Sequence, residues 1–176
     1  MKGYTILVTL MLLAIGLGSF QYWAIGQQDT ASATIGNVAS GVTIDTQTPT
    51  IVSSLRPWRP FGVGNSTHYL YKIAPASDYN GNYTATLYLT NADELGKDFI
   101  YLIMNVTLNK SDGTVVDYKW LGLENGRVQF NIDKTNFTTT SSPAYINITG
   151  GVGNIPFWKT GSLTDPTFVI DVEEIG

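Results

Sequence analysis

Alternation of apolar and polar residues dominates the chain after its N-terminal segment and predicts β-strands rather than helices. No helical period is evident from Gln27 onward. The clearest alternating run covers residues 99–109, and its even positions form an unbroken apolar face: Ile100, Leu102, Met104, Val106 and Leu108. The odd positions become polar toward the end of the run. This pattern predicts a strand with one face in a core and the other partly in water.

Turn dipeptides link this run to two further apolar runs. Asp112-Gly113 precedes residues 114–121, and Asn125-Gly126 precedes residues 127–132. Because both dipeptides favour the positive φ angles of tight hairpins, residues 99–132 are predicted to form a three-stranded meander. Residues 83–90 and 167–172 supply further strands. We therefore expect an all-β fold, a single antiparallel β-sandwich or jelly-roll-like domain over residues 37–176.

The first 26 residues have the layout of an export signal. Lys2 is followed by an apolar run of about 15 residues that ends in small residues, whereas a membrane-spanning helix needs about 20. We expect residues 1–26 to be a signal peptide cut near residues 24–26, after Ala24 or Gly26. An uncleaved anchor is the alternative, since apolar residues continue to Ile25. The mature protein is then extracellular and meets the membrane only during export.

Composition excludes several classes of function. A net charge of −4 argues against nucleic-acid binding, which requires a basic face. The chain has no cysteine and a single histidine, His68, so neither a disulfide framework nor a conventional zinc site is expected. No nucleophile elbow, P-loop or dinucleotide fingerprint is present. We expect no enzyme activity and no cofactor or metal.

Two groups of residues invite a chemical interpretation that we consider weaker than a structural one. The pairs Asp93/Glu94 and Glu173/Glu174 are adjacent in sequence, so in strands they point to opposite faces and do not converge on one sugar bond. Solvated charges near strand ends are the better interpretation. The tryptophans Trp58, Trp120 and Trp158 could form a sugar-binding platform, although packing in a core or interface is favoured.

N-glycosylation is the strongest local signal. Six asparagines fit the acceptor pattern Asn-x-Ser/Thr: Asn65, Asn82, Asn105, Asn109, Asn136 and Asn147. All six follow the leader, as extracellular modification requires. The predicted strand over residues 99–109 would place Asn105 and Asn109 about 13 Å apart on its polar face. We expect several, not all, to be modified.

A short alternating segment directly follows the leader. Within residues 27–36, Ala31, Ala33 and Ile35 would lie on one face of an extended strand. A free N-terminal strand of this kind can complete the sheet of another chain by strand addition. Pairing within its own domain and a disordered tail are the alternatives that the pattern leaves open.

Resemblance favours assembly. The stretch from Gly16 to Asp45, ending in Val38-Ala-Ser-Gly-Val-Thr-Ile-Asp45, resembles the start of the camelysin/TasA family of biofilm-fibre subunits. Leu55-Arg56-Pro57 resembles a later family phrase, but Trp58 and Arg59 replace its Gly-Asp. The acceptor asparagines and the lysine-poor leader make archaeal bundling pili the nearest match. The metal ligands that a metalloprotease activity would require are absent.

This resemblance implies a jelly-roll subunit that polymerises head-to-tail by donor-strand complementation. Residues 27–36 would be the donor strand, with Ala31, Ala33 and Ile35 filling pockets of the neighbour. Copies of the same chain are then the partners, and neighbouring filaments are possible ones. Two other functions remain open at this point: a type-IV-like pilin that retains its N-terminal helix, and a monomeric surface carbohydrate-binding module.

Overall fold

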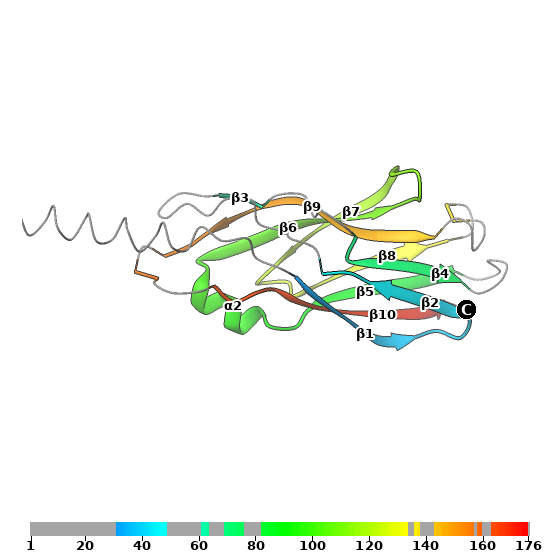
Figure 1. Ribbon diagram of the computed structural model, residues 1–176, viewed down its shortest axis with the longest axis horizontal. Coiled ribbons are helices and arrows are strands. Elements are labelled where there is room, and N and C mark those ends of the chain that lie inside the picture. Colours follow the sequence, from blue (N-terminus) through cyan, green and yellow to red (C-terminus); the bar gives the residue numbers. More distant parts are fainter. Residues whose placement is uncertain are drawn as a thin grey trace, which may run out of the picture.

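A computed structural model describes residues 31–48, 61–63, 69–75, 82–133, 136–137, 143–156, 158–159 and 163–175. Within these ranges the chain forms ten strands and one short helix (Figure 1). The strands are β1 (Ser32–Val38), β2 (Val42–Thr46), β3 (Phe61–Val63), β4 (Tyr71–Pro75), β5 (Asn82–Leu89), β6 (Tyr101–Asn109), β7 (Val115–Gly122), β8 (Arg127–Ile132), β9 (Ala144–Asn154) and β10 (Thr167–Ile175), and the helix is α2 (Ala92–Asp98).

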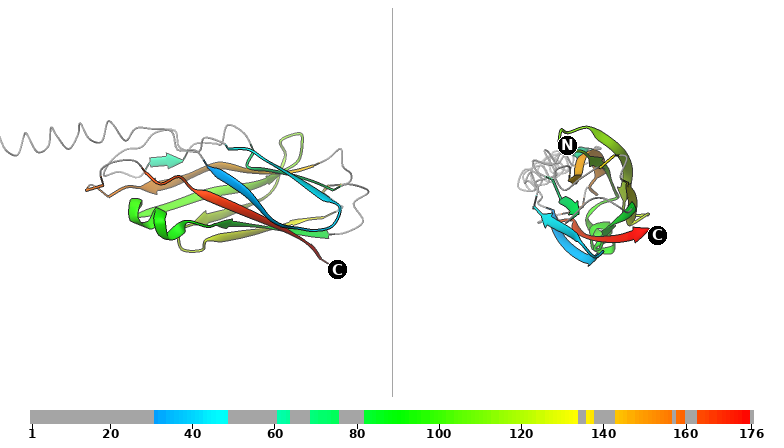
Figure 2. Two further views of the ribbon diagram at one scale, coloured as in Figure 1. Left: turned by 60° about the horizontal axis from the view of Figure 1, so that its bottom comes forward. Right: turned by 90° about the vertical axis from the view of Figure 1, so that its right-hand side faces the viewer.

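The strands form two sheets, as expected for an all-β sandwich. A four-stranded sheet has the order β1-β10-β5-β8, and a six-stranded sheet has the order β2-β4-β9-β6-β7, with β3 also paired to β9. The two layers lie one above the other in Figures 1 and 2. Every pairing is antiparallel except that of β1 with β10, which is parallel. The predicted strands over residues 83–90 and 167–172 are confirmed as β5 and β10.

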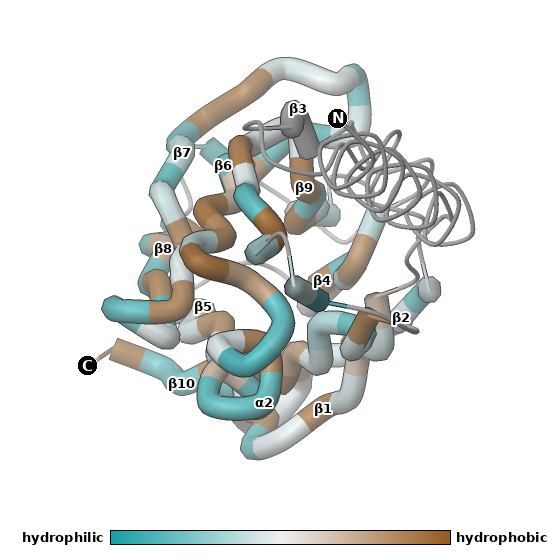
Figure 3. Tube along the Cα trace, turned by 90° about the vertical axis from the view of Figure 1, so that its left-hand side faces the viewer, coloured by the Kyte–Doolittle hydropathy of each residue, from teal (hydrophilic) through white to brown (hydrophobic). Residues whose placement is uncertain are grey.

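The core lies between the two sheets. Alternating residues of β6 and β10 are buried, and they meet apolar residues of β4, β5, β8 and β9 in one cluster. Figure 3 looks along the strands and shows β6 and β9 facing β5 and β10 across this core. On one side of the fold β7 lies near β8, and on the other side β2 lies near β1. Among the described strands, β1, β2, β7 and β8 therefore end the two sheets, and β3 also has a single partner, β9.

The short helix was not expected. Helix α2 has only seven residues, too few to produce a visible period, although Asp93 and Glu94 suit its first turn and Lys97 its last. The end of this helix also makes the next strand begin later than the predicted residue 99. Phe99 closes the helix through its N–H to the Leu95 carbonyl and is buried, so the prediction that Ile100 belongs to the core is wrong. Ile100 is 59% exposed and precedes β6.

The predicted three-stranded meander is wrong in its third strand. The β6–β7 hairpin is confirmed, with Gly113 at φ +86° in its turn, but β8 pairs with β5 in the opposite sheet. The reason is Asn125, whose side chain accepts from the Gly122 N–H and donates to the Trp120 carbonyl, both at 2.7 Å. Asn125 therefore occupies the Gly122 N–H and the Trp120 carbonyl, the backbone groups of β7 to which a third strand would bond. Gly126, at φ +59°, then turns the chain into the other layer.

Candidate functional site

The N-terminal strand lies at the end of the four-stranded sheet of its own domain. β1 runs parallel to β10, with Ser32 beside Thr167 and Ile35 beside Ile170, and the register shifts between Ile35 and Val38. This is the intramolecular pairing that the sequence left open beside strand addition. Residues 27–30 of the proposed donor segment lie outside the described residues.

The three candidate interface residues differ strongly in burial. Ala31 is fully buried, Ala33 is half-buried against the core, and Ile35 is 44% exposed. They share one face by alternation, but only the first part of that face lies over the core. The five residues from Thr34 to Val38 are all exposed. Side-chain burial therefore holds β1 only at its N-terminal end.

One buried side chain from the opposite sheet also holds β1. Tyr71 on β4 is fully buried, and its hydroxyl donates to the Thr34 carbonyl at 2.9 Å. Burial raises the pKa of Tyr71, and the Thr34 bond opposes this only in part, so the phenol remains a protonated donor. The Thr34 hydroxyl donates in turn to the Phe168 carbonyl at 3.1 Å. Tyr71 thus joins the two layers through the backbone of β1.

Gly36 permits the close approach of β1 to β10. A Cβ at this position would lie 2.1 Å from Oδ1 of Asp171 and 3.2 Å from the Ile170 carbonyl oxygen. The Asp171 carboxylate instead accepts the Asn37 N–H at 2.8 Å. The β1–β10 contact therefore consists mainly of backbone bonds, supported by one tyrosine and one glycine.

The acceptor asparagines are unequally accessible. Asn82 is exposed at the start of β5, whereas Asn105, Asn136 and Asn147 are half-buried. Asn109 is only 8% exposed, and its Oδ1 is buried without a hydrogen-bond partner. The amide nitrogen of Asn105 donates to Thr149 Oγ1 at 3.2 Å. Asn65 lies outside the described residues. Among the described asparagines of the acceptor pattern, Asn82 is thus the only exposed one.

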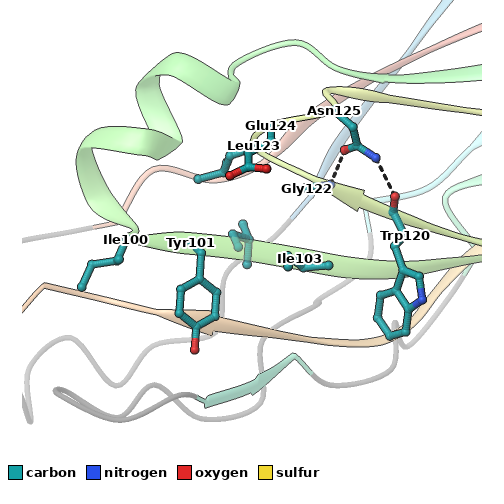
Figure 4. A pocket seen from close by; sticks show the side chains of 9 residues that line it. Ile100, Tyr101, Ile103, Trp120, Gly122, Leu123, Glu124 and Asn125 are labelled. Carbon is teal, nitrogen blue, oxygen red and sulfur yellow. Dashed lines mark hydrogen bonds between the residues drawn. The ribbon is translucent and has the colours of Figure 1, made fainter.

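An apolar hollow of about 320 Å³ lies at the end of β6 and β7, a feature that the sequence did not reveal (Figure 4). Ile100, Ile103 and Trp120 line it and are all more than a third exposed, and Leu123 closes it from the β7–β8 turn. Trp158 is 67% exposed on a different segment, so neither described tryptophan is in the core. Trp58 and His68 lie outside the described residues.

One ion pair is buried beside α2. The Asp98 carboxylate accepts from Lys159 Nζ and from the Thr164 N–H, the latter at 2.6 Å. Burial alone would raise the pKa of Asp98, but the bonds from Lys159 and Thr164 outweigh it and hold this pKa below its ordinary value. The pair fixes the segment before β10 onto the end of the helix.

The paired carboxylates singled out in the sequence lie at the surface. Asp93 and Glu94 are exposed on α2, and Glu173 and Glu174 are exposed near the end of β10. The described part of the chain contains no group of three histidine, cysteine or acidic residues that could hold a metal ion. Nor does it contain a helix long and apolar enough to cross a membrane. No protein-family model matches the sequence, and no curated protein matches it either.

Proposed function

We propose that this chain is a structural subunit of an extracellular filament that polymerises head-to-tail by exchange of its N-terminal strand. The leader over residues 1–26 would be removed on export, and the jelly-roll-like domain would follow the exchanged segment. The observation that supports this proposal is the position of β1, a terminal strand at a sheet edge with one paired neighbour among the described residues.

The energetics of β1 favour exchange. Burial of Ala31 and part of Ala33 contributes only about 1–2 kcal/mol. The backbone ladder and the Tyr71 bond contribute about 1 kcal/mol per hydrogen bond. Backbone bonds form equally well with the same strand of another copy, so exchange costs little at equilibrium. A contact of this kind that does not close on itself generates a fibre.

Removal of β1 would leave a reactive edge. β10 would then present an unpaired edge from Thr167 to Val172, beside the buried side chains of Phe168, Ile170 and Val172. Long apolar edges of this kind recruit further strands. A subunit whose own β1 has moved to a neighbour is therefore expected to accept a β1 from another copy, which propagates the chain of contacts.

The test is deletion of residues 27–36 from the mature protein. We expect the deleted subunit to form no filaments in negative-stain electron microscopy. A synthetic peptide of residues 27–38 should bind it and raise its Tm, whereas the same peptide with Ala31→Asp and Ala33→Asp should not. Filaments formed by the deleted subunit would contradict the proposal. A mature N-terminus at Tyr4 would instead favour a pilin with a retained helix.

A further inference from the structure

β7 presents an unusual edge to solvent. It ends the six-stranded sheet and, among the described residues, pairs only with β6. Val115, Tyr118 and Trp120 are each more than half exposed on it. Edge strands with exposed apolar side chains are templates for pairing with another chain. β7 therefore has the properties of an interaction surface, on the opposite side of the fold from β1 (Figure 3).

Three hydrogen bonds show which backbone groups face this open edge. The Tyr118 N–H donates to Oδ1 of Asp117 at 2.8 Å, and Asn125 binds the Trp120 carbonyl and the Gly122 N–H. Their partners are side chains and not β6, so Tyr118, Trp120 and Gly122 direct these N–H and C=O groups away from β6. Tyr118 and Trp120 can therefore bond to an added strand once Asp117 and Asn125 release these groups.

The two charges on β7 are arranged symmetrically about Tyr118. Asp117 and Lys119 form an ion pair of 3.2 Å, with side chains 39% and 45% exposed. If a second β7 adds antiparallel and centred on Tyr118, Asp117 of each copy faces Lys119 of the other.

The same charges disfavour the neighbouring registers. A slip of two residues in one direction places Asp117 opposite Asp117 of the second copy, and a slip in the other direction places Lys119 opposite Lys119. Like charges directly opposite each other are destabilising, and side chains in these non-hydrogen-bonded pairs are the closest across the ladder. A lone lysine on the edge strand would disfavour pairing with any added strand. An acid and a base two residues apart instead permit one antiparallel register.

We propose that β7 pairs with β7 of a second copy of this chain, antiparallel and centred on Tyr118. The contact is two-fold symmetric. It requires Asp117 to release the Tyr118 N–H, so that the two Tyr118 residues exchange both backbone bonds, and it requires Asn125 to release the Trp120 carbonyl. It uses no residue of β1, so it is a second contact between copies, independent of strand exchange.

The absence of cysteine permits a clean test by cross-linking. In the proposed register the two Cα atoms of residue 118 lie about 5.5 Å apart, inside the disulfide range of about 4.4–6.8 Å. Tyr118→Cys should therefore give a covalent dimer under mild oxidation on a non-reducing denaturing gel. Val116→Cys is the matched control on the same strand, because its two copies would be about 13 Å apart along the ladder. It should not cross-link by itself.

Charge variants in the Tyr118→Cys background test the register. Asp117→Lys places lysines opposite each other, and Lys119→Asp places aspartates opposite each other. Because each change acts twice across the two-fold axis, we expect each variant alone to cross-link about tenfold more slowly. An equimolar mixture of the two variants restores both opposite-charge pairs, and should form heterodimers at close to the original rate.

Specific outcomes would overturn the proposal. Tyr118→Cys that remains monomeric, Val116→Cys that cross-links equally fast, or charge variants that change nothing each exclude the centred β7 pairing. Failure of filament formation would leave the Tyr118→Cys dimer intact, so the two proposals are tested separately.

Discussion

Removal of Lys159 tests how the buried ion pair stabilises the fold. In Lys159→Met the ammonium is lost, and the Asp98 carboxylate, with its side chain only 5% exposed, keeps its backbone and side-chain bonds from Thr164. Breaking a buried pair from one side costs about 3–5 kcal/mol, because an unpaired charge stays out of water. The converse change, Asp98→Ala, leaves a lysine whose side chain is 24% exposed and can reach solvent. We expect a smaller loss there, about 2–3 kcal/mol.

The pH dependence distinguishes these two variants. In the parent chain the pKa of Asp98 is lowered by folding, so the stability that it contributes is complete above the unfolded pKa of about 3.9. That contribution is lost as pH falls through the lower folded pKa. In Lys159→Met, burial opposes only the Thr164 bonds. The folded pKa of Asp98 should then rise, and the penalty should shrink as the solution is acidified toward pH 4.

Urea unfolding at pH 7.0 and pH 4.5, followed by tryptophan fluorescence, measures both effects. The double variant Asp98→Leu with Lys159→Met is the control, and should lie close to the parent because the charges are lost together. A Lys159→Met protein that is less destabilised than Asp98→Ala at pH 7.0, or whose loss is the same at both pH values, would refute the reasoning.

Three further predictions concern β1 and the glycan acceptors. Tyr71→Phe removes the bond to the Thr34 carbonyl and should lower the free energy of urea unfolding by about 1 kcal/mol. Amide hydrogen exchange should become faster in β1 alone. Faster exchange across the whole sheet would contradict this prediction. Gly36→Val should displace β1 and lower the Tm by several degrees, and an unchanged Tm would show that the close approach is unimportant. Mass spectrometry of the native protein should find Asn82 modified and Asn109 unmodified, and the reverse occupancy would contradict the burial argument.

Alternation in the sequence located β5, β6, β7, β8 and β10, but not the sheet to which each belongs, and it left β2, β3, β4 and β9 unpredicted. The odd and even positions of β5, β10 and the first part of β6 were evident because one face is buried there. The prediction that the polar face of β6 lies partly in water is wrong at its end, where Thr107 and Asn109 are buried. β9 carries the same signal in Ala144, Ile146 and Ile148, and could have been found from it. The change of layer at β8 could not. Val128, Phe130 and Ile132 alternate identically in either sheet, and the deciding contact is the Asn125 side chain on the edge of β7.

The sequence indicated which residues belong to the candidate site, but not how they are arranged in space. The pattern at Ala31, Ala33 and Ile35 indicated one face of a strand, which agrees with the burial of the first residue. It could not show that the core ends before Ile35, because that depends on where β10 lies beneath it. The partner strand is more than 130 residues away in sequence, and the bond from Tyr71 comes from a third segment. Contacts of such separation leave no local signature.

The parallel pairing of β1 with β10 also has a mechanical consequence. Because the strands run in the same direction, the start of β1 lies beside the start of β10, and the end of β10 lies at the other pole of the domain. A force that pulls the chain from residue 31 and residue 175 therefore draws the two strands along each other. All the bonds of their ladder resist together, whereas an antiparallel pair pulled from one end would unzip bond by bond. The β1–β10 ladder is therefore the part of the described fold that resists extension between residues 31 and 175.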